Sequence, residues 1–332
     1  MSIQTDLTID ASKFALENVS ESTTQANTLL EKITTGGPRW YDVGAAKYRE
    51  MHMQGKIALP PPVSLPNATS ATVPARENGR EIPIRVYKPD NGRSKGVFLH
   101  SHGGGFVLGS ETSFDKTLQM YANGTQLTAV SVGYRHAPEA PYPAPLHDCL
   151  DTAEYLVDHP EEYGEIRFLG GESAGANLSV NIALHLFRSR PSHSLSGLVL
   201  QYGLYDLSMS MPAIKFARPL MLDGPALAQF IEAYTPGLSN EERRDPLMSP
   251  LYADLSGLAV ASKGLPPALF VCGTADLLVD ENLLMGARWS IAGGESIVKL
   301  YPGAGHGFTA LPGLDVAEEA CEVSLQFIRE RM

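Results

Sequence analysis

The sequence is poor in cysteine, in positive charge and in long apolar runs, and each shortage excludes a class of protein. Three cysteines in 332 residues, spread far apart and odd in number, exclude a disulfide framework and favour buried free thiols. The 26 basic residues against 37 acidic ones leave a formal charge of -11, which argues against a nucleic-acid or anionic-membrane partner. No run approaches the roughly 18 apolar residues that a membrane span needs.

Targeting and metal-binding patterns are also missing. The first residues include neither a basic start nor the apolar stretch of a secretory signal. We therefore expect a cytoplasmic protein. The spacings H-E-x-x-H and C-x-x-C are absent, as are the glycine-rich patterns of dinucleotide and P-loop sites, so we expect neither a metal nor a cofactor.

What is present is an alternation of short apolar strands with helices, and 43% hydrophobic residues are ample for a deep core. We predict strands at 81–88, 95–101, 128–134, 166–169, 197–202, 267–272 and 296–301, and helices at 144–157, 177–188, 280–292 and 316–331. Such an alternation predicts an α/β fold whose mostly parallel sheet is covered by helices on both faces.

Two segments stand outside this rhythm. We predict helices within residues 1–62, including one at 40–53. The segment ends in three prolines, which cannot continue a helix. Residues 205–263 are far longer than a simple crossover needs. We expect both segments to form a cap over the carboxyl ends of the strands, and residues 63–204 and 264–332 to form the core. The alternative is that both segments are peripheral additions to the fold and form no cap.

The sequence Gly171-Glu172-Ser173-Ala174-Gly175 follows a predicted strand and precedes a predicted helix. It fits G-x-S-x-G, a turn so tight that larger residues two positions either side of the serine would clash. Ser173 is therefore the candidate nucleophile. The alternative is an ordinary small-residue loop, because so short a pattern also occurs by chance.

A serine nucleophile needs a base and an orienting acid within hydrogen-bond reach. His306 lies in a glycine-rich loop directly after the strand predicted at 296–301, and Asp276 follows the strand predicted at 267–272. Both could therefore meet Ser173 at one edge of the sheet, in the chain order serine, aspartate, histidine. Asp280 is the rival acid, although we expect it to cap the helix that follows.

Catalysis by a serine also needs donors for the negative charge that develops on the carbonyl oxygen. His102 is followed by three glycines directly after a predicted strand, and glycines expose backbone amides that can converge on one oxygen. The amide of Ala174, the residue after the candidate nucleophile, is the usual further donor. We predict an oxyanion hole rather than a phosphate cradle here.

With these motifs in place, the chain resembles the hormone-sensitive-lipase-like family of α/β-hydrolases, the esterases related to arylacetamide deacetylase. The resemblance covers most of residues 80–330 and extends to segments 134–148 and 245–250. It implies an α/β-hydrolase fold with an eight-stranded core and a helical cap. It also implies a triad of Ser173, Asp276 and His306, with oxyanion donors at Gly103, Gly104 and Ala174. Many members have aspartate where this chain has Glu172, which we interpret as a structural acid that supports nearby loops.

The resemblance implies a serine carboxylesterase that acts on short- to medium-chain or small-metabolite esters. An amidase, a deacetylase, a lactonase or a non-catalytic small-molecule receptor are the alternatives. We predict that an apolar pocket for the acyl or alcohol group is lined by Trp40, Phe106, Phe216, Leu220 and Met221. The alternative is that these side chains are ordinary residues of the hydrophobic core. By analogy with the family, two copies would pair through the strand at 296–301.

Overall fold

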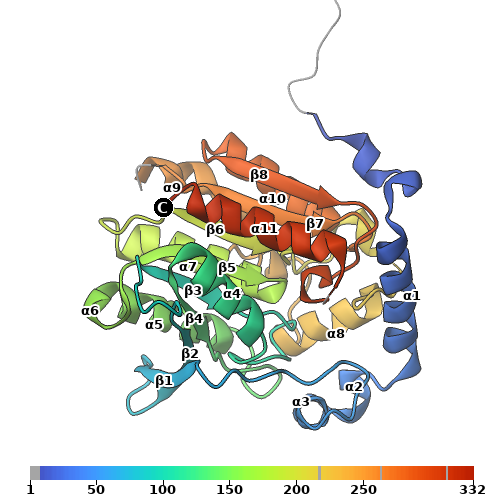
Figure 1. Ribbon diagram of the computed structural model, residues 1–332, viewed down its shortest axis with the longest axis horizontal. Helices are drawn as coiled ribbons and strands as arrows, with labels where there is room; N and C mark the ends of the chain where they lie inside the picture. Colours follow the sequence, from blue (N-terminus) through green and yellow to red (C-terminus); the bar gives the residue numbers. More distant parts are fainter. Residues whose placement is uncertain (1–7, 216–217, 262–263, 312) are drawn as a thin grey trace, which may run out of the picture.

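Eight strands in the described part of the chain form one sheet, in the order β1-β2-β4-β3-β5-β6-β7-β8 (Figure 1). The structure is a computed structural model that describes residues 8–215, 218–261, 264–311 and 313–332. The strands are β1 Thr69–Pro74, β2 Glu81–Tyr87, β3 Val97–Ser101, β4 Thr128–Val132, β5 Ile166–Glu172, β6 Gly197–Gln201, β7 Ala268–Gly273 and β8 Ser296–Tyr301. β2 runs antiparallel to β1 and β4, and the other pairings are parallel. The predicted mostly parallel sheet of eight strands is confirmed.

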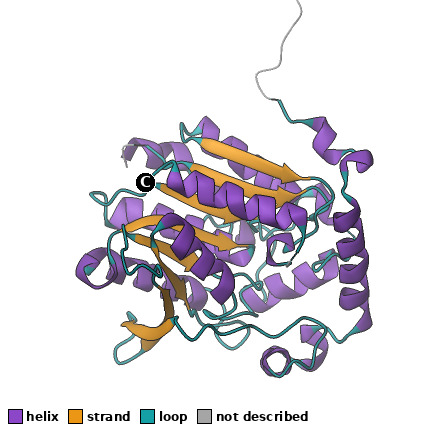
Figure 2. Ribbon diagram, in the orientation of Figure 1, coloured by secondary structure: helices purple, strands orange, loops and turns teal. Residues whose placement is uncertain are grey.

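The apolar runs of the inner strands supply both faces of this sheet. In β3, Val97 and Leu99 join one buried cluster and Phe98 joins the other, as the two-residue period of a strand requires. Helices cover both faces (Figure 2). The first cluster contains residues of α5 Ala144–Asp158, α7 Ala174–Ser189 and α10 Val279–Ile291, and the second contains residues of α4 Asp115–Thr125 and α11 Asp315–Arg329. Strands buried on both faces are typical of such three-layer folds.

Further helices lie at the carboxyl ends of the central strands (Figure 1). They are α1 Glu21–Gly36, α2 Trp40–Val43, α3 Ala45–Met53 and α8 Gly224–Tyr234, and the remaining helices are α6 Pro160–Tyr163 and α9 Leu255–Ala261. The N-terminal and mid-chain segments contact each other through the ion pair of Arg39 with Asp223, 2.7 Å long. α9, near the end of the mid-chain segment, packs on α7 and α10.

Some local features differ from the prediction. β1 and α4 were not predicted, and in β1 only Val73 is buried, so that strand lacks the alternating apolar pattern. The helix predicted at 40–53 is two helices, because Gly44 between them takes φ +89°, outside the helical region. None of the helices that the structure describes is long and apolar enough to cross a membrane.

Candidate active site

Ser173 lies on the sharp turn between β5 and α7, with φ +54°, a conformation that side chains rarely adopt. A Cβ atom on Gly171 would come within 2.6 Å of the carbonyl carbon of Gly175, and one on Gly175 within 2.7 Å of the carbonyl oxygen of His102. Both glycines are therefore required by close backbone approach, as the motif predicts. The turn leaves Ser173 8% exposed.

His306 and Asp276 meet Ser173 in a line of hydrogen bonds. The Nε2 atom of His306 lies 2.9 Å from the Oγ atom of Ser173, and its Nδ1 atom lies 2.9 Å from the Oδ2 atom of Asp276. All three side chains are buried. With Nδ1 protonated, His306 donates to the carboxylate and its Nε2 lone pair faces the serine hydroxyl, which is the arrangement of a general base and its nucleophile.

The neighbouring chain holds both partners in place. The other carboxylate oxygen of Asp276 accepts the backbone N–H of Leu278 at 2.9 Å. The ring of Tyr202 meets His306 edge to face, with the ring centres 5.0 Å apart. Burial raises the pKa of Tyr202, so it remains a neutral phenol beside the imidazole. The contact of Tyr202 with His306 was not predicted, because the sequence around an aromatic residue after β6 does not indicate which side chain its ring packs against.

The rival acid lies elsewhere. The carboxylate of Asp280 accepts the backbone N–H of Ala213 at 2.8 Å. Asp280 falls inside the first turn of α10, whose N-cap position is Leu278. The expectation that Asp280 caps this helix is therefore wrong, although Asp276 rather than Asp280 contacts His306 as predicted.

Gly103 and Gly104 lie on a loop that we call the oxyanion loop, residues 102–109. A Cβ atom on Gly103 would come within 2.9 Å of the carbonyl oxygen of Glu172, so the loop runs directly beside the serine turn. The carbonyl of Gly104 accepts the N–H groups of Val107 and Leu108 at 3.1 and 2.8 Å. Within the described residues, the N–H groups of Gly103 and Gly104 have no acceptor. They remain available for a developing negative charge.

Two imidazoles lie at the start of the oxyanion loop: buried His102, its first residue, and half-buried His136, whose ring centre is 5.6 Å from that of His102. His102 stacks on Tyr134, with ring centres 4.1 Å apart, and its Nδ1 atom donates to the carbonyl of Gly103 at 2.8 Å. Burial lowers the pKa of His102 well below its usual range. Burial and the positive charge of Arg49 lower the pKa of His136 to about 4. Both rings are therefore neutral near pH 7. Neither imidazole places a positive charge beside the backbone amides of the loop.

The predicted pocket residues have different surroundings. Trp40 packs on Phe230 of α8, and the fully buried ring of Phe106 stacks on Tyr234. Phe216 lies outside the described residues. Phe106 therefore presents no open surface to a substrate in this structure.

Leu220 and Met221 lie beside the loop that carries His306. A Cβ atom on Gly305 would come within 2.7 Å of the Cβ atom of Leu220, and one on Gly307 would lie 3.7 Å from Cγ of Met221. Met221 also lines a cavity bounded by Arg39 and Tyr48. Met221 is thus a predicted pocket residue that lines a cavity in this structure.

Glu172, the residue before Ser173, has a buried partner. Its carboxylate accepts from the Nε2 atom of His100 at 2.9 Å, and the Nδ1 atom of the same ring contacts Ser131 at 3.0 Å. The pair links β5 to β3 and β4, directly below the serine turn. This contact agrees with a structural acid and gives it a specific partner.

Replacing Glu172 by alanine is expected to lower the free energy of unfolding by about 1–3 kcal/mol, because the buried Nε2–H of His100 loses its acceptor. Glu172→Gln keeps a carbonyl acceptor and is expected to lose less. Urea unfolding measures both, with Glu161→Ala, a change at an exposed glutamate, as the control. Equal stability of Glu172→Ala and Glu161→Ala would contradict this role.

A group of potential metal ligands lies near the start of β5, at the opposite end of that strand from Ser173. Among the described residues, His159, Glu161 and Glu162 bring three ligand atoms together. His159 is the N-cap of α6, and both glutamates lie in its first turn. α6 precedes the start of β5, whereas Ser173 follows the end of that strand. The two glutamates are exposed, and exposed acidic groups commonly gather without an ion.

Comparison with known proteins agrees with this architecture. A family model described as the alpha/beta hydrolase fold matches residues 98–310. An acetyl esterase of Salmonella typhi is 28% identical over 277 residues, 80% of this chain and 82% of that protein. A hyperthermophilic esterase from the archaeon Pyrobaculum calidifontis superposes with a TM-score of 0.80 at 28% identity, covering 94% of this chain and 98% of the other. A thermophilic carboxylesterase cloned from a metagenomic library gives a TM-score of 0.73 at 26% identity, covering 86% and 97%.

The family match spans well over half of the chain, and the predicted fold is confirmed. The chain belongs to the α/β-hydrolase family, in its hormone-sensitive-lipase-like group of esterases. The protein is accordingly a carboxylic-ester hydrolase.

Proposed function

We propose that this esterase hydrolyses small carboxylic esters of short or medium acyl chain through a covalent acyl-enzyme on Ser173. The observation that carries the proposal is the line of two 2.9 Å hydrogen bonds from Asp276 through His306 to Ser173. Unpaired loop amides lie beside the same serine turn. Nucleophile, base, orienting acid and oxyanion donors are the four parts that acyl transfer by a serine requires.

The reaction proceeds in two halves. In the first, His306 takes the proton of the Ser173 hydroxyl as its oxygen attacks the ester carbonyl, and Asp276 stabilises the imidazolium. The amides of Gly103, Gly104 and Ala174 hold the oxyanion. His306 then gives its proton to the leaving alcohol, and in the second half it activates the water that releases the acid.

The surroundings of Ser173 favour a small substrate. The serine is nearly enclosed, and Leu220 packs against the loop that carries His306. We propose that residues 1–62 and 205–263 act together as the cap that limits what reaches the serine. A relative, the acetyl esterase of Salmonella typhi, is named for a short acyl group of this kind.

The experiment is a series of p-nitrophenyl esters from acetate to palmitate with the purified protein. We expect kcat/KM to be highest for acyl chains of two to about eight carbons, since one methylene in a fitted pocket changes selectivity by about 10–200-fold. A matched p-nitroanilide separates ester from amide cleavage. Highest activity on palmitate, or on the anilide, would contradict the proposed substrate class.

A further inference from the structure

The mid-chain helix α8 lies directly on the oxyanion loop. Gly105 has φ +62°, and a Cβ atom added to it would come within 2.5 Å of the Cγ atom of Phe230. The ring of Phe230 therefore covers the backbone of the residue that follows the two proposed donor glycines. Phe230 also contacts Trp40 of α2, with ring centres 5.1 Å apart.

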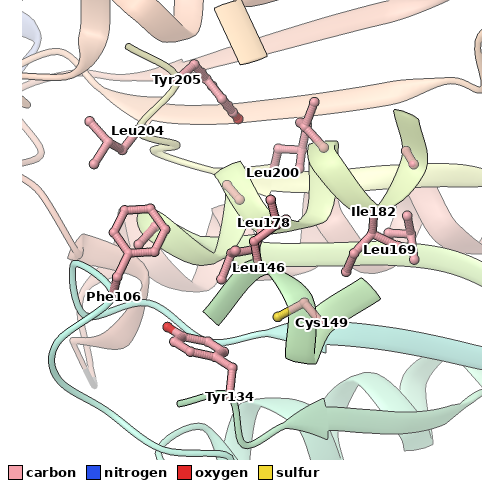
Figure 3. Close-up of a cluster of buried hydrophobic side chains, with 14 of the residues drawn as sticks. Phe106, Tyr134, Leu146, Cys149, Leu169, Leu178, Ile182, Leu200, Leu204 and Tyr205 are labelled. Atoms are coloured by element: carbon pink, nitrogen blue, oxygen red, sulfur yellow. The ribbon is translucent and has the colours of Figure 1, made fainter. Parts of the chain in front are cut away.

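A second aromatic contact fixes the next residue of the loop. Phe106, a non-glycine residue with φ +63°, is fully buried, and its ring stacks on Tyr234 with centres 3.8 Å apart and planes 9° from parallel. Figure 3 shows Phe106 and Tyr134 among the buried side chains of one hydrophobic cluster. The hydroxyl of Tyr134 donates to the carbonyl of His102 at 2.7 Å. The loop is thus fastened to the core at one end and to α8 in the middle.

The N-terminal segment provides a third attachment. Arg49 of α3 donates from its guanidinium to the carbonyl of Val107 at 2.8 Å, and also pairs with Glu139 at 2.6 Å. Residues from both segments outside the core therefore contact the oxyanion loop. None of them was predicted to do so, because each contact joins residues far apart in the sequence.

We propose that Phe230 is a positioning residue for the oxyanion hole: its ring, supported by Trp40, holds Gly105 and thereby keeps the amides of Gly103 and Gly104 aimed at the reacting carbonyl. This inference rests on the proposed function. It gives the cap a part in the chemical step as well as in substrate selection.

The physical reason lies in the composition of the loop. Three successive glycines have more accessible conformations than any other tripeptide, so an unrestrained loop would spread its N–H groups over many directions. Oxyanion donors act only when they lie about 2.7–3.1 Å from the position that the oxyanion takes. A rigid ring over Gly105 removes conformations in which that distance is lost.

The test compares Phe230→Ala and Phe230→Leu with Phe230→Tyr, which keeps the ring. Gln229→Ala, a change at the exposed neighbour on α8, is the matched control. For one short p-nitrophenyl ester we expect Phe230→Ala to lower kcat by about 10–100-fold, less than the loss of a whole donor costs, with KM within about twofold of the parent. Phe230→Tyr and Gln229→Ala should keep kcat near the parent value.

A boronic acid that adds to the serine supplies an independent readout, because its tetrahedral adduct uses the same amides. We expect its inhibition constant to rise in Phe230→Ala by about the factor by which kcat falls. A merely structural role would lower the melting temperature without moving kcat and this constant together. If Phe230→Ala instead raises KM by a factor that grows with acyl length and leaves kcat unchanged, Phe230 is a pocket residue and the inference is overturned.

A double-mutant cycle with Gly105→Ala tests the contact itself. The added methyl group meets the Phe230 ring in the parent but not in Phe230→Ala, so the double variant should be more active than the product of the single effects predicts. Simple additivity would overturn the inference. If the parent turns over no ester, or turns it over as well as Ser173→Ala does, the proposed function fails. If only Ser173→Ala is inactive and Phe230→Ala matches the parent, this inference fails alone.

Discussion

Replacing Ser173 by alanine is expected to reduce ester turnover by at least about 10⁴-fold, since no covalent intermediate can then form. The substitution removes one oxygen atom from a turn whose shape depends on Gly171 and Gly175, so the fold should be unaffected. Initial rates on p-nitrophenyl acetate measure the effect, and thermal unfolding verifies the fold.

The control for this prediction is Ser192→Ala, which makes the same chemical change at an exposed position. It should retain the activity of the parent. Residual turnover by Ser173→Ala is expected from binding and the oxyanion donors, at about 10³–10⁴ times the rate in water. Activity of Ser173→Ala within tenfold of the parent would contradict the assignment of the nucleophile.

The second large effect is expected for Asp276→Asn, about 10⁴-fold in kcat. The backbone N–H of Leu278 needs an acceptor, so the asparagine oxygen takes that place and its NH₂ group faces His306. The imidazole must then accept at Nδ1 and carry its proton at Nε2. In that tautomer Nε2 has no lone pair for the proton of Ser173, and the base is lost although the geometry is kept.

Asp280→Asn is the matched control, because Asp280 lies four residues further on and accepts the N–H of Ala213. Its asparagine oxygen can keep that bond, so kcat should stay within a few-fold of the parent. The measurement is kcat and KM for both variants on one ester. A larger loss in Asp280→Asn than in Asp276→Asn would reverse the assignment of the acid.

The sequence predicts the features that depend on local chemistry. Gly171 and Gly175 are required by close approach within one turn, and the motif alone therefore indicates where Ser173 lies. His306 and Asp276 each follow a parallel strand, and the carboxyl ends of such strands share one edge. The family resemblance supplied the rest of the fold, including the number of strands.

What could not be predicted depends on contacts between distant segments. The sequence around Asp280 indicates the start of a helix. Nothing in it indicates that the carboxylate accepts the backbone N–H of Ala213. The exposed edge strand β1 lacks the alternation on which strand prediction relies. Phe230 over Gly105 is the clearest case, since an amphipathic helix shows which face is apolar but not which loop it covers.

The pairing of two copies through β8 stays a prediction, and so does the cap of residues 1–62 and 205–263. β8 forms one end of the sheet, and in the described chain it pairs with β7 alone. Its residues from Ser296 to Leu300 are partly exposed, which leaves an edge available to a second copy.

The most direct test of the central claim is to identify the residue that becomes covalently modified. The protein is treated with a diethyl aryl phosphate, which transfers its phosphoryl group to an activated serine, and the product is examined by intact-mass and peptide mass spectrometry. The account predicts one phosphoryl group per chain on the peptide that contains Ser173, with matching loss of esterase activity, and none in Ser173→Ala. Full inactivation with the modification on another residue, or none at all, would contradict it.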